Sequence, residues 1–295
     1  MLVLQSALSV LLYSPHPTKL VLRGGTNVQK SPAIDYTKHI LLPFLHKHFG
    51  IDCHLDICRR GLSHGGGEVF LSITPLECRL KCISLLERGE ITSITGVLWC
   101  ARQEYEILGQ ALEQSITREL AKTYPKVAVT FTRGQPTPSA DCALGVLLYA
   151  STSLHNHIAA STTLEIPTRI GPGGLPKQEV KARERGAEVV RRLQKQVSYG
   201  GVVDEYLADQ LVIFMALATA GVEPPAQEWA DGAEGATRKA KKRKCELLVG
   251  EVSLHAETAM KIAEIILANI VFSIQKRENG SVIICEQKVD GGGVE

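Results

Sequence analysis

The sequence predicts an α+β protein in which helices pack on sheets. Within residues 18–74, strand-like runs alternate with one helical window and a glycine-rich turn, in the order strand, helix, strand, turn, strand. From about residue 86 to 177 a second alternation begins, with enough apolar residues for a core of its own. A chain of 295 residues with 44% hydrophobic side chains is large enough for two such cores.

The chain opens on an apolar run at residues 1–13, which we interpret as a buried core helix. The run resembles a signal peptide, but it lacks a positively charged start and a clear cleavage site. It is also too short to span a bilayer, and no later run reaches about 18 uninterrupted apolar residues, so we expect no transmembrane helix and no membrane partner. Alternating or apolar runs then predict strands at 19–23, 53–58 and 68–74, and helical spacing predicts a helix at 35–49.

The second alternation predicts strands at 91–100, 126–132 and 142–152 and a helix at 105–121. A glycine and proline cluster at 169–176 marks the end of this segment. Amphipathic spacing predicts helices at 178–197, 203–218 and 256–268, followed by strands at 270–275 and 281–286. We therefore expect a discontinuous core domain at 1–85 and 178–295, and a smaller inserted α/β domain at 86–177.

Residues 220–246 interrupt this pattern. They are rich in alanine, glycine and glutamate and end in a basic run at 238–244, with too few apolar side chains to pack. We expect a disordered inserted loop. The basic run is compatible with a nuclear localisation signal, an RNA contact or a solubilising segment. The basic face of the helix at 178–197 is compatible with exposure to solvent or with an RNA contact.

Charge and cysteine usage narrow the possible functions. The 33 basic and 31 acidic residues give a net charge of +2, so any nucleic-acid contact must come from a local site. The eight cysteines contain no CxxC pair, which indicates a reducing compartment. Cys78 and Cys82 are four residues apart, but no second pair at zinc spacing accompanies them, which disfavours a metal site.

Three segments place glycine or polar residues where a strand gives way to a turn or helix. They are residues 23–27, 203–210 and 254–259. Each has an ordinary structural explanation when taken alone. His255 fits a polar residue at a helix start, Tyr206 a core ring, and Asp209 and Gln210 a solvated first turn.

Taken together and in order, these motifs resemble a known family. The residues are Arg23-Gly-Gly-Thr-Asn27 with Pro32 and Asp35-Tyr-Thr37, Arg60-Gly61 with Gly65-Gly-Gly-Glu68, Leu86-Glu-Arg-Gly89, Asp204-Glu-Tyr-Leu-Ala-Asp-Gln210 within 200–217, and His255-Ala-Glu-Thr-Ala259. The chain is similar to the RNA 3′-terminal phosphate cyclase family over nearly its whole length. That resemblance implies repeated two-helix, four-strand units in the core domain.

The resemblance also implies a function. Family members use ATP to convert an RNA 3′-phosphate to a 2′,3′-cyclic phosphodiester through a histidine-bound AMP. By position, the nucleophile is His255, and the residues expected around the adenylate are Gln5, Pro32, Tyr206, Asp209 and Gln210. A helix start disfavours an imidazolium cation, which suits a nucleophilic ring. Mg²⁺ is the expected divalent metal, and no protein ligand is assigned to it.

Two departures from the family pattern leave alternatives open. Residues 60–65 are shorter than usual and carry Leu62-Ser-His64 where a proline is typical. The family's opening segment, with Glu-Gly-Gly-Gly-Gln and phosphate-binding arginines, is not matched. We expect a nuclear or cytosolic, N-terminally shortened cyclase. The alternatives are a non-catalytic scaffold for RNA or ribosome assembly and an inactive truncated cyclase.

Overall fold

The computed structural model describes residues 2–28, 31–62, 65–134, 142–167, 169–171, 173–225 and 242–288. The first part contains one antiparallel sheet with strand order β1-β3-β2 and the helices that cover it. Its elements are α1 (Leu2–Leu11), β1 (Thr18–Gly24), α2 (Ile34–Tyr36), a π-helical turn (Thr37–Leu41), α3 (Leu42–Phe49), β2 (Cys53–Arg59) and β3 (Gly67–Ile73).

The middle of the chain forms a four-stranded sheet with order β6-β5-β7-β8 and two long helices. Only the β5–β6 pair is parallel within this sheet. Its elements are β5 (Ile91–Cys100), a 3₁₀ turn (Gln103–Tyr105), α4 (Glu106–Thr123), β6 (Ala128–Arg133), β7 (Ala143–Thr152), β8 (His157–Glu165) and α5 (Gly174–Ser198).

The last part forms a second four-stranded sheet, with order β10-β11-β9-β4. One of its strands, β4 (Ser84–Leu85), lies between β3 and β5 in the sequence and pairs with β9 in parallel. The other elements are α6 (Glu205–Ala220), β9 (Lys244–Val249), α7 (Leu254–Ile266), β10 (Ile270–Arg277) and β11 (Gly280–Gln287).

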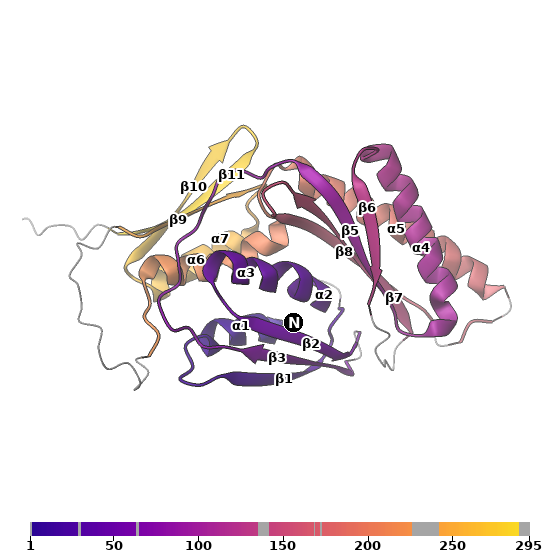
Figure 1. Ribbon diagram of the computed structural model, residues 1–295, viewed down its shortest axis with the longest axis horizontal. Coiled ribbons are helices and arrows are strands. Elements are labelled where there is room, and N and C mark those ends of the chain that lie inside the picture. The colour runs from indigo at the N-terminus through magenta and orange to yellow at the C-terminus, as the bar shows by residue number, and fades with distance from the viewer. Residues whose placement is uncertain are drawn as a thin grey trace, which may run out of the picture.

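Helices lie between two of these sheets. In Figure 1, α1, α3, α6 and α7 occupy the space between the β1–β3 sheet below and the β9–β11 sheet above. One hydrophobic cluster joins side chains from both sheets and from these helices. The expected α+β class is confirmed, and the helix pair α6 and α7 with the sheet β10-β11-β9-β4 makes a two-helix, four-strand unit.

The opening apolar run is a helix, as expected, but only one of its faces is buried. Leu4, Leu8 and Leu12 recur every four residues and are fully buried, whereas Leu2 and Val10 are mostly exposed. The spacing of four residues explains this difference, because it puts one stripe of α1 against α6. In the described ranges, no helix is long and apolar enough to cross a membrane.

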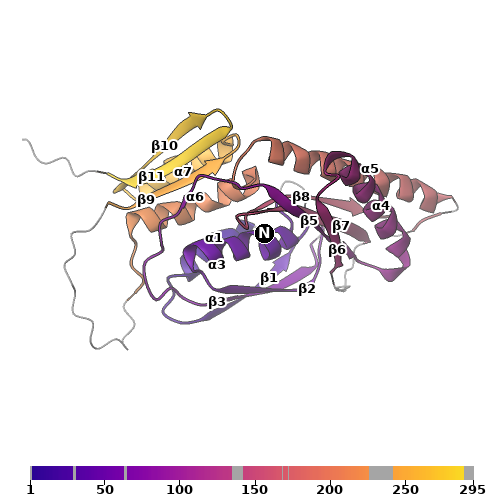
Figure 2. The ribbon, with the colours of Figure 1, turned by 45° about the horizontal axis from the view of Figure 1, so that its top comes forward.

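Both faces of the middle sheet are buried. One face packs against α4 and α5, and the other joins the cluster of the central helices, which attaches this sheet to the rest of the molecule. Along β7, Val146 and Leu148 face the cluster made with α4 and α5, while Leu147 between them joins the cluster of the central helices. Alternate side chains of a strand point to opposite faces, so every residue of this stretch is apolar. Figure 2 shows α4 and α5 on the outer side of this sheet.

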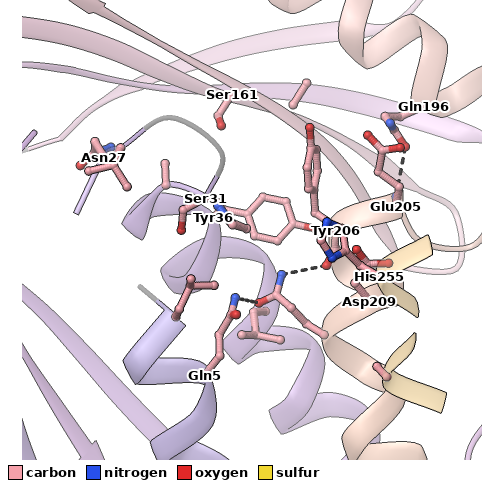
Figure 3. Close-up of a pocket in the computed structure, with 18 of the residues that line it drawn as sticks. Gln5, Asn27, Ser31, Tyr36, Ser161, Gln196, Glu205, Tyr206, Asp209 and His255 are labelled. Atoms are coloured by element: carbon pink, nitrogen blue, oxygen red, sulfur yellow. Dashed lines mark hydrogen bonds between the residues drawn. The ribbon is translucent and has the colours of Figure 1, made fainter. Parts of the chain in front are cut away.

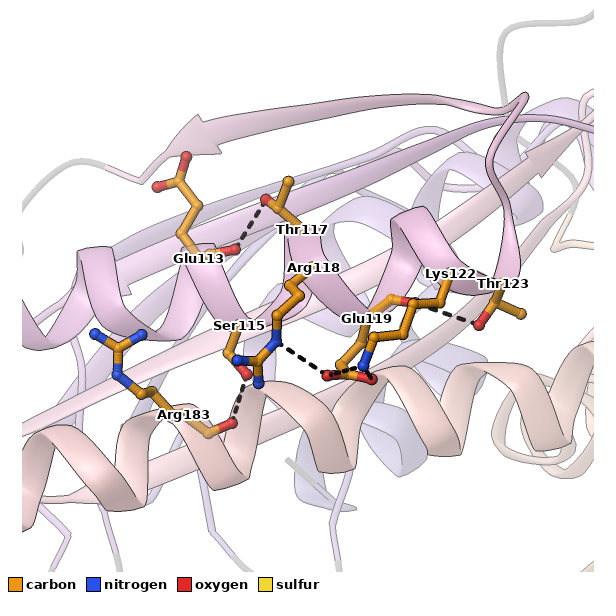
Figure 4. Close-up of polar contacts among 8 residues, drawn as sticks. All are labelled: Glu113, Ser115, Thr117, Arg118, Glu119, Lys122, Thr123 and Arg183. Carbon is orange, nitrogen blue, oxygen red and sulfur yellow. Dashed lines mark hydrogen bonds and ion pairs between the residues drawn. The ribbon is translucent and has the colours of Figure 1, made fainter.

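Helix α5 packs closely along α4. Ser115 Oγ donates a hydrogen bond to the Arg183 carbonyl oxygen at 2.7 Å (Figure 4). Gly186 permits this approach, because a Cβ there would lie 2.8 Å from the Leu112 carbonyl oxygen. From the sequence, we expected α5 to belong to the core domain that resumes at residue 178. The buried side chains of α5 lie in the same hydrophobic cluster as those of α4. The division at residues 85 and 178 stays a prediction.

Three of the described strands, β4, β8 and β9, were not recognised from the sequence, and β4 has only two residues. Strand β8 is rich in alanine, serine and threonine and therefore lacks the apolar signal of its neighbours. Strand β9 begins at Lys244, inside the loop expected at 220–246, so the end of that loop is corrected to a strand whose Cys245 and Leu247 are buried. The preceding basic residues hid this alternation. Residues 226–241 lie outside the described residues, as does most of the basic run at 238–244.

Candidate active site

A cavity of about 1980 Å³ lies where α1, the loop before α2, β8, α5, α6 and α7 meet. Figure 3 shows side chains from these elements directed into it. All six residues expected from the sequence line this cavity, namely Gln5, Pro32, Tyr206, Asp209, Gln210 and His255. They come from four segments that are far apart in the chain, so the fold brings the expected residues together.

The start of α6 is held by a buried carboxylate. Asp204 accepts hydrogen bonds from the backbone N–H groups of Tyr206 and Leu207, both at 3.1 Å. It also accepts from the Tyr36 hydroxyl at 2.6 Å and from the Ala159 N–H at 2.9 Å. Burial raises the pKa of Asp204 to about 6, and the hydrogen bonds oppose that rise. This one side chain therefore fixes α6 against α2 and β8.

Two residues of the first turns of α6 face the cavity from a fixed backbone. The Tyr206 ring is 45% exposed and meets the Tyr36 ring edge-on, with centroids 6.3 Å apart. The Gln210 side-chain amide donates to the Tyr206 carbonyl oxygen at 2.8 Å and accepts from the Gln5 amide at 2.7 Å. Gln5 on α1 and Gln210 on α6 thus form one polar pair beside an open aromatic face.

His255 is the second residue of α7 and is exposed to the cavity. Ser253 caps this helix by accepting a hydrogen bond from the Ala256 N–H at 3.0 Å, and it donates to Asp209 Oδ1 at 2.5 Å. Burial raises the pKa of Asp209, while the Ser253 hydrogen bond and the nearby His255 oppose the rise. Ser253 therefore links the carboxylate on α6 to the helix that carries His255. Figure 3 shows Asp209 and His255 close together at the cavity.

The loop that carries Pro32 is anchored by a buried ion pair. Both Arg60 Nη atoms donate to the Asp35 carboxylate, at 2.6 and 2.7 Å, and each side chain is at most 5% exposed. The Arg60 guanidinium also stacks 4.6 Å from the centre of the Trp99 ring on β5. Of the 60–65 turn that departs from the family pattern, residues 63 and 64 lie outside the described residues.

Several residues around the cavity were not selected from the sequence. Asp204 and Ser253 could have been predicted as helix caps, because each is a capping residue type just before a helical run. Tyr36 belongs to the Asp35-Tyr-Thr37 motif, but nothing local indicates its hydrogen bond to Asp204, which is 168 residues away. The cavity wall on α5 carries charges of both signs, at Lys181, Glu184, Arg185, Glu188, Arg192 and Lys195. Solvent face and RNA contact both stay predictions for this wall.

A protein-bound metal ion needs several ligand side chains close together. Over the described part of the chain, no group of three or more histidine, cysteine, aspartate or glutamate side chains is arranged to hold a metal ion. Asp209 and Glu205 line the cavity, but they do not form such a group with a third ligand. The described side chains therefore do not fit a dedicated metal site, and we assign no protein ligand.

Comparison with known proteins decides the family. The pattern of the RNA 3′-terminal phosphate cyclase family matches residues 1–274. The chain belongs to this family. Two relatives named RNA 3′-terminal phosphate cyclase are similar to 96% of the chain: one from Drosophila melanogaster at 26% identity and one from Staphylothermus marinus at 28%. A probable RNA 3′-terminal phosphate cyclase from Dictyostelium discoideum is 26% identical over 97% of it.

The alignments with these relatives cover nearly all of this chain but a smaller share of each relative. The aligned regions cover 69% of the Drosophila protein, 71% of the Staphylothermus protein and 60% of the Dictyostelium protein. The match to this chain includes every residue that the sequence placed around the adenylate, since all lie within residues 1–274.

Proposed function

We propose that this chain is an ATP-dependent RNA 3′-phosphate cyclase that works through a covalent histidine–AMP intermediate. The observation that carries the proposal is the single cavity lined by His255, Tyr206 and Asp209 together with Gln5, Pro32 and Gln210. Family membership supports the same activity. The substrates are ATP and the 3′-phosphate end of an RNA.

The adenine base of ATP binds at the Tyr206 face. An exposed aromatic ring held at a fixed angle offers a stacking surface to any base. The Gln5 and Gln210 amides beside it carry donors and acceptors that can exchange their mutual hydrogen bond for contacts with the base edge. Pro32 in the opposite loop gives an apolar wall. With the base against Tyr206, we infer that the α-phosphate lies toward the start of α7.

His255 acts as the nucleophile. An imidazole nitrogen attacks the α-phosphorus of ATP, the bond to the bridging oxygen breaks, and pyrophosphate leaves. The AMP group then passes to an oxygen of the RNA 3′-phosphate, which restores the imidazole. The adjacent 2′-hydroxyl attacks the 3′-phosphorus and expels AMP, leaving the cyclic phosphodiester. Asp209, fixed by Ser253, stabilises positive charge on the ring during the first step.

We propose Mg²⁺ as the metal that accompanies ATP, and the nucleus or cytosol as the location. Mg²⁺ accompanies ATP and supplies charge neutralisation at the phosphates when bound. No step is assigned to it through a protein ligand. The chain acts on RNA in the nucleus or cytosol, where its eight thiols stay reduced.

A cyclisation assay tests the activity. The protein is incubated with ATP, Mg²⁺ and an oligoribonucleotide ending in a 3′-phosphate, and the product is tested for resistance to phosphatase. We expect a resistant, ATP-dependent product whose mass is one water lower than that of the 3′-phosphate. An oligonucleotide ending in 2′-deoxy-3′-phosphate cannot cyclise and should instead keep the transferred AMP. A folded preparation that binds the RNA and leaves its end unchanged would instead support the scaffold alternative.

A further inference from the structure

Three of the eight cysteines lie near the C-terminal end of α6, away from Tyr206 and Asp209 near its start. Cys245 on β9 and Cys285 on β11 are direct partners across the two antiparallel strands, and both are fully buried. Cys82 precedes β4, whose pairing with β9 is extended by a hydrogen bond of 2.8 Å from the Glu246 N–H to the Ile83 carbonyl oxygen. This register sets Ile83 opposite Cys245, so Cys82 lies one residue from that position, and its sulfur interacts with the Cys245 thiol.

Cys82 differs from its two neighbours in access and in charge environment. Its side chain is half-buried, and its sulfur lies 3.6 Å from the Ala218 carbonyl oxygen. The Cys245 thiol donates a hydrogen bond to it, which lowers the pKa of Cys82, and the nearby Arg243 guanidinium adds to this effect. Although burial opposes both, the pKa of Cys82 falls to about 6.

The partner thiols have the opposite character. The pKa of Cys245 is raised, because its proton is shared with Cys82 and because the side chain is buried. Burial raises the pKa of Cys285 to about 12. A thiolate reacts with peroxides far faster than a thiol, so only one member of this cluster is both reachable and reactive. The neighbouring thiol is then placed to resolve the product.

We propose that Cys82 and Cys245 form an oxidation site at which hydrogen peroxide produces an intramolecular disulfide. The Cys82 thiolate attacks one peroxide oxygen, the O–O bond breaks, and Cys82 becomes a sulfenic acid as hydroxide leaves. The Cys245 thiol then attacks the Cys82 sulfur, the S–O bond breaks, and water leaves with the Cys245 proton. Overall, two thiols lose two electrons and two protons, and the peroxide becomes two waters.

The position of this bond determines its effect. It would join the segment between β3 and β5 covalently to β9, beside the end of α6. The site is separate from the cavity and does not depend on the cyclase activity, since it rests on the cysteines, the strand register and Arg243. Arg243 Nε also donates to the Ala218 carbonyl oxygen at 2.6 Å, which fixes the charge next to the reactive sulfur.

Mass spectrometry of the oxidised full-length chain tests the proposal. The reduced protein is treated with a small excess of hydrogen peroxide, and thiols are counted after unfolding. We expect the number of free thiols to fall from eight to six, with a mass lower by two hydrogen atoms and a peptide pair linked through Cys82 and Cys245. Linkage of Cys245 to Cys285, or oxygen addition without a linked pair, would overturn it.

Three variants identify the order of the steps. Cys82→Ser removes the linked pair, whereas Cys245→Ala leaves a sulfenic acid on Cys82 that dimedone traps. Cys78→Ser is the matched control, because Cys78 is the more exposed thiol only four residues away and its loss leaves the linked pair intact. If accessibility alone governed the reaction, Cys78 would be oxidised first, and that result would contradict the proposal. Melting curves of the reduced variants show that each is folded.

Discussion

Tyr206 presents an aromatic ring to a cavity rather than to a core. Its backbone is fixed by the Asp204 cap and its carbonyl oxygen by Gln210, so the ring keeps one orientation. A fixed ring loses little conformational freedom when a base stacks on it, which is why an open tyrosine at this position indicates nucleotide binding.

Replacement of this ring tests the adenine contact. Tyr206→Ala removes a stacking interaction of about 1–3 kcal/mol, so we expect the Kd for ATP to rise roughly 5- to 150-fold. Tyr206→Phe is the control, because it keeps the ring and loses only the hydroxyl, and its Kd should stay close to that of the parent protein. Isothermal titration calorimetry gives both values. An unchanged Kd in the alanine variant would place the base elsewhere.

At the scale of single residues, the sequence indicated residues that line one cavity, but it did not indicate their contacts. The family motifs selected His255, Tyr206 and Asp209, and the structure places all three around one cavity. Tyr36 lies within a family motif and Ser253 has a helix-capping residue type, but neither signal indicates a partner, because the hydrogen bonds of these residues reach 168 and 44 positions away. A sequence pattern contains residue types and spacing, but it does not contain pairs of this separation.

Helix α6 depends on one buried carboxyl group whose protonation changes with pH. The pKa of Asp204 is about 6 in the folded protein, against an ordinary value of 3.8. Between these values the folded protein retains a proton that the unfolded chain has lost. The contribution of Asp204 to the free energy of unfolding is therefore complete below pH 3.8 and is lost as the pH rises through 6.

The expected pH dependence can be measured with an amide variant. A pKa difference of about two units corresponds to about 3 kcal/mol, so Asp204 lowers the free energy of unfolding by up to that amount as the pH rises from 4 to 7. Asp204→Asn does not titrate and should lack this decrease, although it is less stable overall. Urea unfolding at several pH values gives the difference between the two proteins. Asp56→Asn, at an exposed carboxylate, should keep the parent slope.

Elements were predicted well where periodicity was strong and poorly where it was masked. The helices at α4 and α6 and the strands β5 and β10 lie close to their expected positions. Strand β8 is mostly alanine, serine and threonine, with Ile158 and Leu164 as its large apolar residues, and β9 follows a basic run. Burial of these strands is imposed by their partners β7 and β11. Tertiary pairing rather than local sequence determines such strands.

Over the whole molecule, Arg60 connects the sheet of the first part with the sheet of the middle segment. It pairs with Asp35 beside the cavity loop and stacks on Trp99 of β5. Neither charge reaches solvent, and removal of one leaves the other buried and unpaired. Such a loss is far larger than that of an exposed pair.

This connection predicts a large effect on stability. Arg60→Met should lower the free energy of unfolding by about 3–5 kcal/mol, measured by urea denaturation. Arg23→Met is the control, since Arg23 is 76% exposed in its pair with Glu68, and it should change the same quantity by about 0–1 kcal/mol. Adding Asp35→Asn to Arg60→Met should recover part of the loss. Equal effects of the two arginine substitutions would show that the buried pair contributes no more to stability than the exposed pair.

Covalent labelling of the folded protein with ATP that carries a radioactive α-phosphate tests the central claim most directly. With Mg²⁺ present, the proposed chemistry predicts an acid-labile, hydroxylamine-sensitive label that is lost in His255→Ala and kept in His54→Ala, a control at an exposed histidine of β2. Unlabelled protein with a normal melting curve, or a label that persists in His255→Ala, would contradict the assignment of His255 as the nucleophile.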